Sequence, residues 1–195
     1  MKTKKGTLTV QRVKTGFTTK KVVFSAMAIA LATVIATVIK LPSLPNGGSV
    51  TLFSMLVVTL VGYWYGPTVG ITAAVTYGIL QFITEPYAIH PLQVVLDYPL
   101  AFGALGISGF FSRGKNPIIR GYIAAVLGRF IFASLSGLIF FTTYAKVLEE
   151  NLAAVWASLL YNMSYLLPEA VLTVLLLMMP GVKKALAKLK EMAED

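Results

Sequence analysis

The amino-acid sequence predicts an all-α integral membrane protein, a six-transmembrane-helix bundle with both termini cytoplasmic. The chain has 195 residues, of which 56% are hydrophobic and 13% are charged, whereas about a quarter of the residues in a soluble domain are charged. Six apolar runs approach or exceed the roughly 20 residues that cross a bilayer as a helix. Most lysines and arginines lie in every second segment between these apolar runs, which is where segments on one side of the membrane fall. This composition excludes a water-soluble globule, and the short connections leave no room for a separate soluble catalytic domain.

The first apolar run, residues 22–39, follows a basic segment. Residues 1–21 contain seven lysines and arginines and no acidic residue. A basic segment before an apolar run is also typical of a signal peptide. The length of this run, the lack of a clear cleavage site and the later apolar runs favour a membrane helix instead.

Turn residues separate the other five apolar runs. The second run ends at Tyr65-Gly66-Pro67, the third ends near Glu85-Pro86, and a loop with Arg113, Gly114 and Lys115 follows the fourth. These boundaries predict helices over 50–64, 68–84, 91–112, 117–142 and 153–180.

The placement of basic residues predicts the orientation. If the N-terminus is cytoplasmic, the cytoplasmic segments hold 14 of the 17 lysines and arginines, as the positive-inside rule requires. The domain organisation is then a basic cytoplasmic segment at 1–21, a six-helix transmembrane domain at 22–180 and a basic amphipathic cytoplasmic tail at 181–195. The tail is typical of a helix end that meets anionic lipid. The net charge of +9 therefore reflects membrane topology, and no nucleic-acid partner is expected.

The residue types present narrow the chemistry. The chain has no cysteine and one histidine, His90, so we expect no metal site and no cofactor. Serine catalysis needs a base within hydrogen-bond reach, and no serine motif accompanies His90, so an intramembrane enzyme is disfavoured. The intramembrane acidic residues are too few for a proton relay, which argues against a proton-driven pump. A stand-alone secondary transporter stays an alternative.

Three ionisable residues fall within apolar runs: Asp97, Arg129 and Glu169. Each costs roughly 2.5–3.5 kcal/mol at the bilayer centre on insertion scales, so each needs a structural or functional reason. One reason is an internal ion pair of Arg129 with Glu169 or with Asp97. If Arg129 pairs with Glu169, Asp97 is left to bind a cation or a hydrogen-bond donor.

Aromatic and amide side chains cluster at the predicted depth of Asp97, in the outer half of the bundle. An aromatic belt at the membrane interface is one interpretation. The other is a pocket, in which rings stack on a ligand while a carboxylate and an amide bind it. Such a pocket suits a flat, nitrogen-rich cationic ring compound that arrives from outside. The residues are Tyr87, His90, Gln93, Tyr98, Phe140, Phe141, Tyr144, Trp156, Tyr161, Asn162 and Tyr165.

The run HPLQVVLDYPLAF at 90–102 resembles the signature of the ThiT family, the thiamine-binding S-components of energy-coupling factor (ECF) transporters. Three further segments agree in order and spacing: GGSVT at 47–51, SGLIFF at 136–141 and YNMSYLLP at 161–168. The resemblance implies six helices, a thiamine pocket near the outer face and a multi-pass location in the plasma membrane of a prokaryote. It also implies delivery through a transmembrane coupling subunit bound to two ATPase subunits, with no ATPase activity in this chain.

The resemblance also assigns roles to residues. Asp97 takes the place of an acidic thiamine ligand, Tyr98 is an aromatic wall, and Tyr87 stacks on the substrate. Asn162 hydrogen-bonds the substrate, and Phe141 holds an aromatic place. The other assigned residues are Arg129, near the hydroxyethyl end of thiamine, and the small-residue stripe Ala28, Ala32 and Ala36, a docking face for the coupling subunit. The same stripe is also typical of internal helix packing.

Two positions depart from the family pattern. Ala133 stands where the family commonly has histidine, and Ala157 stands where it has tyrosine. At least one polar contact is therefore lost, and His90 or Trp156 is the candidate to replace it. A thiamine precursor or another vitamin accordingly remains an alternative ligand.

Overall fold

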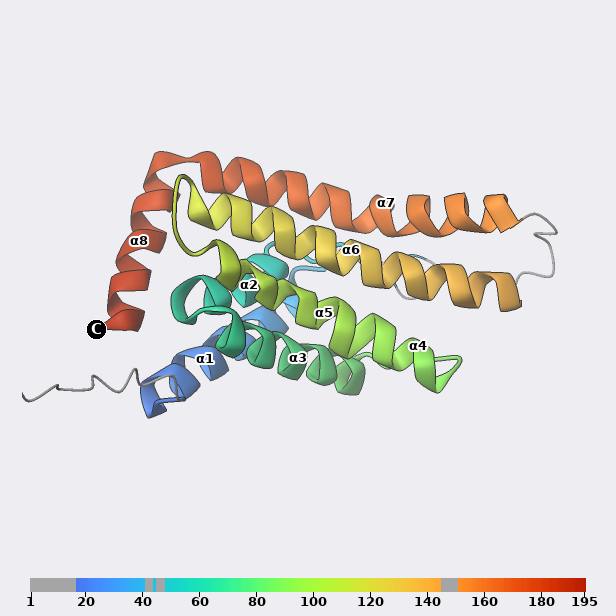
Figure 1. Ribbon diagram of the computed structural model, residues 1–195, viewed down its shortest axis with the longest axis horizontal. Coiled ribbons are helices and arrows are strands. Elements are labelled where there is room, and N and C mark those ends of the chain that lie inside the picture. Colours follow the sequence, from blue (N-terminus) through green and yellow to red (C-terminus); the bar gives the residue numbers. More distant parts are fainter. Residues whose placement is uncertain (1–16, 41–43, 45–47, 145–150) are drawn as a thin grey trace, which may run out of the picture.

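The computed structural model describes residues 17–40, 44, 48–144 and 151–195, with the side chains of 141–144 and 151–154 outside this description. Regular structure in these residues is helical throughout (Figure 1). The long elements are α1 (Thr19–Val38), α2 (Ser54–Tyr65), α3 (Pro67–Thr84), α6 (Pro117–Tyr144), α7 (Asn151–Met178) and α8 (Pro180–Glu194). Of the predicted basic segment 1–21, residues 1–16 lie outside the described residues.

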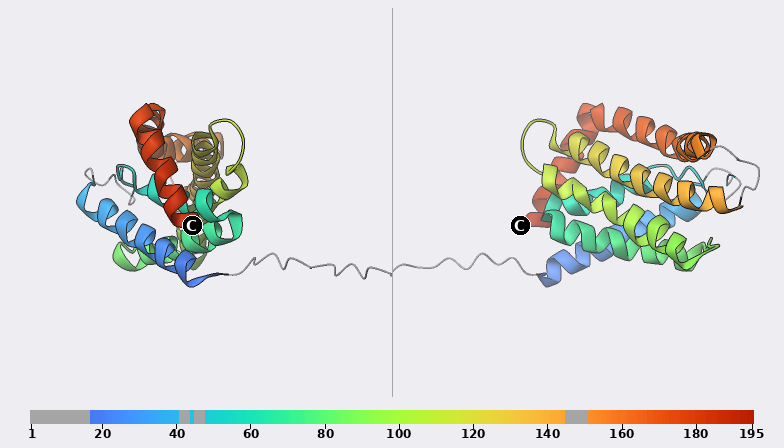
Figure 2. Two further views of the ribbon diagram at one scale, coloured as in Figure 1. Left: turned by 90° about the vertical axis from the view of Figure 1, so that its left-hand side faces the viewer. Right: turned by 45° about the vertical axis from the view of Figure 1, so that its right-hand side comes forward.

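The helices form an elongated bundle with one distinct end. Helices α6 and α7 lie side by side and run antiparallel, and α8 turns across the end of the bundle where α7 finishes (Figure 1). The start of α1 and the C-terminus lie at this same end (Figure 2). The segment 181–195, predicted as an amphipathic tail, is the helix α8, whose Val182 and Leu186 pack against the bundle core.

Among the described residues, five helical stretches have the length and composition to cross a membrane. They are Thr19–Val38, Pro67–Thr84, Pro91–Phe111, Pro117–Phe140 and Val155–Met178. Helix α2 has only 12 residues, or about 18 Å at 1.5 Å per residue, against a hydrocarbon core of about 30 Å. The sequence predicted a helix over 50–64, but helical structure begins only at Ser54.

The fourth apolar run is an irregular helix. It consists of α4 (Pro91–Val95), a π-helical turn η2 (Leu96–Leu100), α5 (Ala101–Gly103) and a 3-10 segment η3 (Ala104–Phe111). Pro99 lies inside the π turn, and because proline has no backbone N–H it interrupts the regular hydrogen-bond ladder. Single π turns are frequent at functional sites, and this one carries Asp97 and Tyr98.

Glycines bring three of these elements into backbone contact. A Cβ atom placed on Gly70 of α3 would lie 2.9 Å from the carbonyl oxygen of Gly106 in η3 and 2.5 Å from the Cα of Gly62 in α2. Such close approach is the usual way in which helices pack in membranes. Helices α2 and α3 and segment η3 therefore form a tightly packed scaffold beside the irregular helix.

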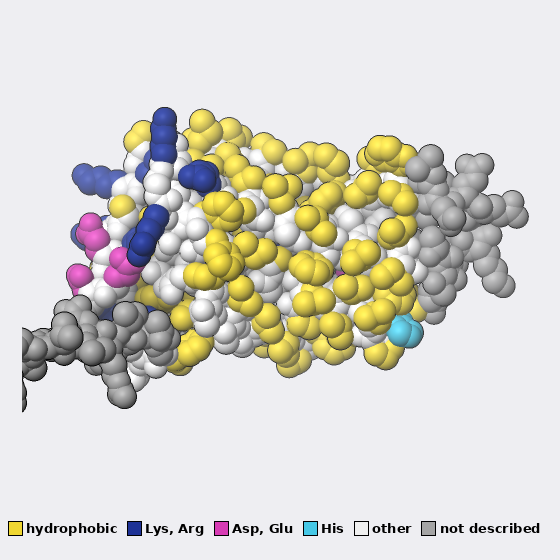
Figure 3. Space-filling view, viewed as in Figure 1, with side chains coloured by type: hydrophobic (Ala, Val, Ile, Leu, Met, Phe, Trp, Pro, Cys, Tyr) yellow, Lys and Arg dark blue, Asp and Glu magenta, His cyan; other side chains and the backbone are white. Residues whose placement is uncertain are grey.

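The surface fits a membrane environment. Hydrophobic side chains cover the middle of the face in Figure 3, and charged side chains gather at the end where α8 lies. Large apolar side chains are exposed along α1, α6 and α7, among them Leu31, Ile131 and Leu175. An apolar surface of this extent is typical of contact with lipid.

The small-residue stripe of α1 faces inward. Ala28, Ala32 and Ala36 are buried, with Ala28 packed beside Val61 of α2 and Ala73 of α3. In the isolated chain the stripe is thus used for internal packing, and its role in docking a coupling subunit stays a prediction. The small side chains of the stripe allow α1 to approach its neighbours closely.

Candidate ligand-binding cavity

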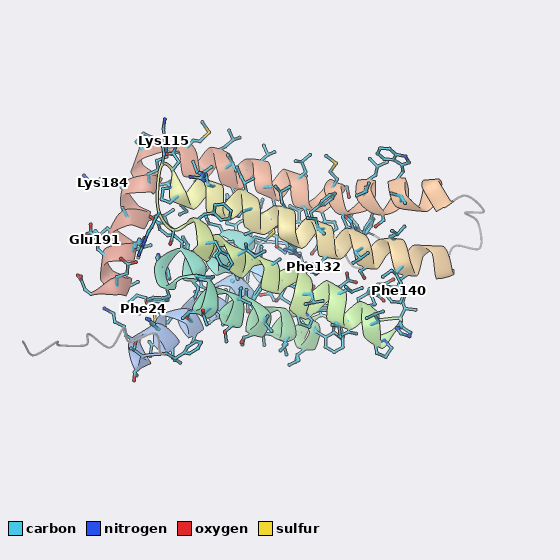
Figure 4. The ribbon with its side chains drawn as sticks, viewed as in Figure 1. Phe24, Lys115, Phe132, Phe140, Lys184 and Glu191 are labelled. Carbon is cyan, nitrogen blue, oxygen red and sulfur yellow. The ribbon has the colours of Figure 1, made fainter. Side chains whose placement is uncertain are left out.

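A cavity of about 370 Å³ opens between α3, the irregular helix, α6, α7 and the non-helical chain before α2. This volume falls within the roughly 300–1,000 Å³ typical of small-molecule sites. Phe140 lines the cavity, and Figure 4 places Phe140 far from Lys115, Lys184 and Glu191. The cavity therefore lies toward the end of the bundle opposite α8.

Five of the predicted site residues meet in the wall of this cavity: Tyr87, Asp97, Tyr98, Arg129 and Asn162. They come from the α3–α4 connection, the π turn, α6 and α7. The carboxylate of Asp97 is partly buried and has Ser136 and Gln93 as polar neighbours. Within the described residues, no ion pair involves Asp97.

His90 and Trp156 were predicted to replace the lost contact, and neither lies in the cavity wall. The Nδ1 atom of His90 accepts the backbone N–H of Leu92 at 3.1 Å and so caps α4, while the ring stacks on Phe140 with centroids 5.5 Å apart. Trp156 is 57% exposed on α7. His90 therefore serves as a helix cap and Trp156 does not face the cavity, and their contribution to ligand binding stays a prediction. The side chain of Phe141 lies outside the described residues.

Arg129 lies over a ring. Its guanidinium carbon is 4.0 Å from the centroid of Phe102, a cation–π contact that is stronger where water is excluded. The ion pairs within the described part of the chain are Lys40–Glu85 and Lys190–Glu194. The ion pair of Arg129 with Asp97 or Glu169, one of the interpretations of these charges, is therefore not formed, and the cavity wall holds a carboxylate and a guanidinium that do not pair with each other.

Glu169 has a structural partner instead. This carboxylate is 2% exposed and accepts the backbone N–H of Met55 and the hydroxyl of Thr51, each at 3.2 Å. The first N–H groups of a helix lack partners within the helix and carry partial positive charge. Glu169 therefore caps the start of α2 deep inside the bundle.

Tyrosine hydroxyls bind the backbone of two connecting segments whose residues line the cavity. Tyr161 accepts the backbone N–H of Gly48 at 2.8 Å. Tyr98 accepts the N–H of Tyr87 at 2.9 Å and donates to the carbonyl of Glu85 at 3.0 Å. The Lys40–Glu85 ion pair links the two segments. The non-helical chain before α2 lines the cavity, a setting in which irregular backbone is tolerated within a membrane.

The side chain of Asn162 is occupied by protein partners. Its Nδ2 atom donates to the carbonyls of Ala133 at 3.3 Å and Ser158 at 2.9 Å, and its Oδ1 accepts the hydroxyl of Tyr165 at 2.6 Å. Both amide hydrogens are therefore used to join α6 and α7. Of the two departures from the family pattern, Ala133 lines the cavity, whereas Ala157 is exposed outside it.

Several residues of the cavity wall were not predicted as site residues from the sequence, notably Gln81, Ser136, Thr51 and Phe102. Uncharged polar residues inside apolar runs carry little weight in a hydropathy pattern. Gln81 lies in the last turn of α3, four residues before Glu85, and its long polar side chain at the end of an apolar run could have marked it.

The comparisons with known proteins agree with one another. The family model described as "Thiamine transporter protein (Thia_YuaJ)" matches residues 22–189. The thiamine transporter ThiT of Bacillus subtilis (strain 168) is 33% identical over 150 residues, which cover 69% of this chain and 76% of that protein. The solved structure of ThiT from Listeria monocytogenes is similar in fold, with a TM-score of 0.58 and 20% identity over 84% of this chain and 94% of that one.

Proposed function

The chain belongs to the thiamine transporter protein family, and from this premise we propose that it is the substrate-capture subunit of an ECF-type importer. In this role the chain binds thiamine from outside the plasma membrane of a prokaryote. It delivers thiamine through a coupling subunit, and partner subunits hydrolyse the ATP.

The observation that carries the proposal is the cavity around Asp97. Thiamine has a cationic thiazolium ring and an aminopyrimidine ring. A carboxylate without an ion-pair partner suits the cation and the amine, and the aromatic side chains of Tyr87, Tyr98 and Phe140 offer stacking surfaces. The guanidinium of Arg129 suits the hydroxyl oxygen at the other end of the ligand.

We propose different roles for the two remaining site residues, Asn162 and Phe141. Asn162 contributes to the wall and keeps α6 against α7 through its own hydrogen bonds. Phe141 keeps the aromatic place that the family resemblance gives it.

We propose six membrane crossings with both termini cytoplasmic. Helix α2 and the non-helical chain before it together form the crossing that α2 is too short to make alone. The two ends of the bundle support the orientation, since α8 and the start of α1 share one end (Figure 2) and the cavity lies toward the other. Placing the basic end in the cytoplasm satisfies the positive-inside rule and opens the cavity to the outside.

Uptake of labelled thiamine into proteoliposomes tests this function. We expect uptake only when the coupling subunit, the two ATPase subunits and enclosed ATP are present with this chain. Uptake by the chain alone that follows an ion gradient would instead show a secondary transporter.

One observation favours a second ligand. Ala133, at a position where the family resemblance places histidine, lies in the cavity wall, so the contact with thiamine that this histidine would make is absent. A competition panel of thiamine precursors and other vitamins against labelled thiamine decides this point. We expect thiamine to compete best, and a tighter competitor would identify the alternative ligand.

A further inference from the structure

Two buried polar atoms in the cavity wall are not satisfied by the described residues: the side-chain carbonyl oxygen of Gln81 has no hydrogen-bond partner, and the hydroxyl of Ser136, beside the Asp97 carboxylate, makes no hydrogen bond of standard geometry. Both residues line the cavity, Ser136 from α6 and Gln81 from α3. Ser136 is 1% exposed. Leaving a buried polar atom without a partner costs free energy, so its retention needs a reason.

The neighbourhood of Ser136 indicates what it can bind. A polar neighbour of its hydroxyl within the cavity is the carboxylate of Asp97. A serine hydroxyl both donates and accepts and reorients by rotation about one side-chain bond. A carboxylate accepts only. Together the two side chains complement a ligand edge on which an amine lies beside a ring nitrogen.

Gln81 adds a third polar side chain to Ser136 and Asp97, from α3 on another side of the cavity. Helix α3 packs against the π turn that carries Asp97, and Gln81 lies one turn before Glu85, whose backbone carbonyl accepts the hydroxyl of Tyr98. The unpartnered oxygen of Gln81 can only accept. Asn162, by contrast, has both amide hydrogens occupied by protein carbonyls.

We propose that Ser136 and Gln81 are ligand-binding residues that determine specificity in this cavity. Ser136 acts with Asp97 on the amine and the adjacent ring nitrogen of an aminopyrimidine, and Gln81 accepts a hydrogen bond from a ligand N–H or O–H. This inference rests on the proposed function and extends it, because it names the contacts that select the aminopyrimidine.

Calorimetric titration of purified full-length variants with thiamine tests the inference. Ser136→Ala and Gln81→Leu are each expected to weaken binding by about fivefold to tenfold, the effect of one lost hydrogen bond. Ser134→Ala is the matched control, because the Ser134 hydroxyl, two residues away, is likewise buried without a hydrogen bond of standard geometry to the described residues but does not line the cavity. Its thiamine affinity should equal that of the wild type.

Stability of the ligand-free protein separates a binding role from a structural one. Neither variant removes a hydrogen bond of standard geometry within the described part of the protein, so their melting temperatures without thiamine should stay equal to that of the wild type or rise. The increase in melting temperature on adding thiamine should be smaller than in the wild type. A variant that loses stability without ligand and keeps its affinity overturns the binding role.

A ligand-side comparison needs no variant. Oxythiamine, in which oxygen replaces the amine, should bind the wild type more weakly than thiamine, and Ser136→Ala should reduce that difference. Equal affinity of the wild type for both compounds, or unchanged thiamine affinity in both folded variants, overturns the inference. A folded wild type that does not bind thiamine overturns the proposed function itself, which is a separate outcome.

Discussion

The carboxylate of Glu169 on α7 accepts the backbone N–H of Met55 at the start of α2, over 3.2 Å. The other oxygen of this carboxylate accepts the hydroxyl of Thr51, a residue that lines the cavity. One buried acid thus fixes both the beginning of a helix and a piece of the binding wall. Glu169 caps α2, and it affects the ligand site only indirectly, through its hydrogen bond with Thr51.

Replacing Glu169 should therefore destabilise the bundle and disturb binding together. Glu169→Leu leaves the Met55 N–H without its acceptor, which costs about 1–3 kcal/mol of stability. Glu169→Gln keeps an acceptor oxygen and should lose less. Thermal unfolding in detergent and thiamine titration measure the two effects. Equal stability of the leucine variant and the wild type would show that the cap does not matter.

Gly48 should not tolerate a side chain. A Cβ atom there would lie 2.7 Å from the hydroxyl oxygen of Tyr161 and 2.9 Å from the ring of Tyr165, so Gly48→Ala must shift either the segment or the two tyrosine side chains in the cavity wall. We expect thiamine affinity to fall about tenfold, equivalent to ~1.4 kcal/mol. Gly181→Ala is the control, because its Cβ meets nothing within 4 Å. Unchanged affinity in Gly48→Ala would mean that this segment does not shape the site.

The Lys40–Glu85 ion pair should contribute little to stability. Both side chains are partly exposed, and exposed pairs measure about 0.2–1 kcal/mol in double-mutant cycles. A cycle with Lys40→Met and Glu85→Gln should give a coupling below ~1 kcal/mol that decreases as salt is added. A larger, salt-independent coupling would show that the pair is a structural clasp between the two connecting segments.

The sequence predicts most of the helical framework because lipid exposure imposes long apolar runs. It fails where the structure departs from regular helices. The run that contains α2 is apolar from residue 50, yet the chain before Ser54 is non-helical because Glu169, a residue far away in sequence, supplies its cap. No local pattern encodes that contact.

In the candidate site, too, some features can be predicted from the sequence and others cannot. Asp97 and Arg129 stand out because charges are rare in apolar runs, and both lie in the cavity wall. The spacing of these residues along the sequence does not reveal their partners, since Arg129 contacts the ring of Phe102 and forms no ion pair with any described residue. Trp156 and Ala28 show that residue type alone does not reveal which side of a membrane helix faces the bundle.

Thiamine titration of the wild type and of Asp97→Asn by calorimetry tests the central claim most directly. We predict one-to-one binding to the wild type and at least tenfold weaker binding to the folded variant, because a hydrogen bond to a charged group is worth roughly 1.5–3 kcal/mol. A folded wild type that gives no binding heat with thiamine at any temperature tested would contradict the ligand. Equal affinity of the two proteins would contradict the role of Asp97.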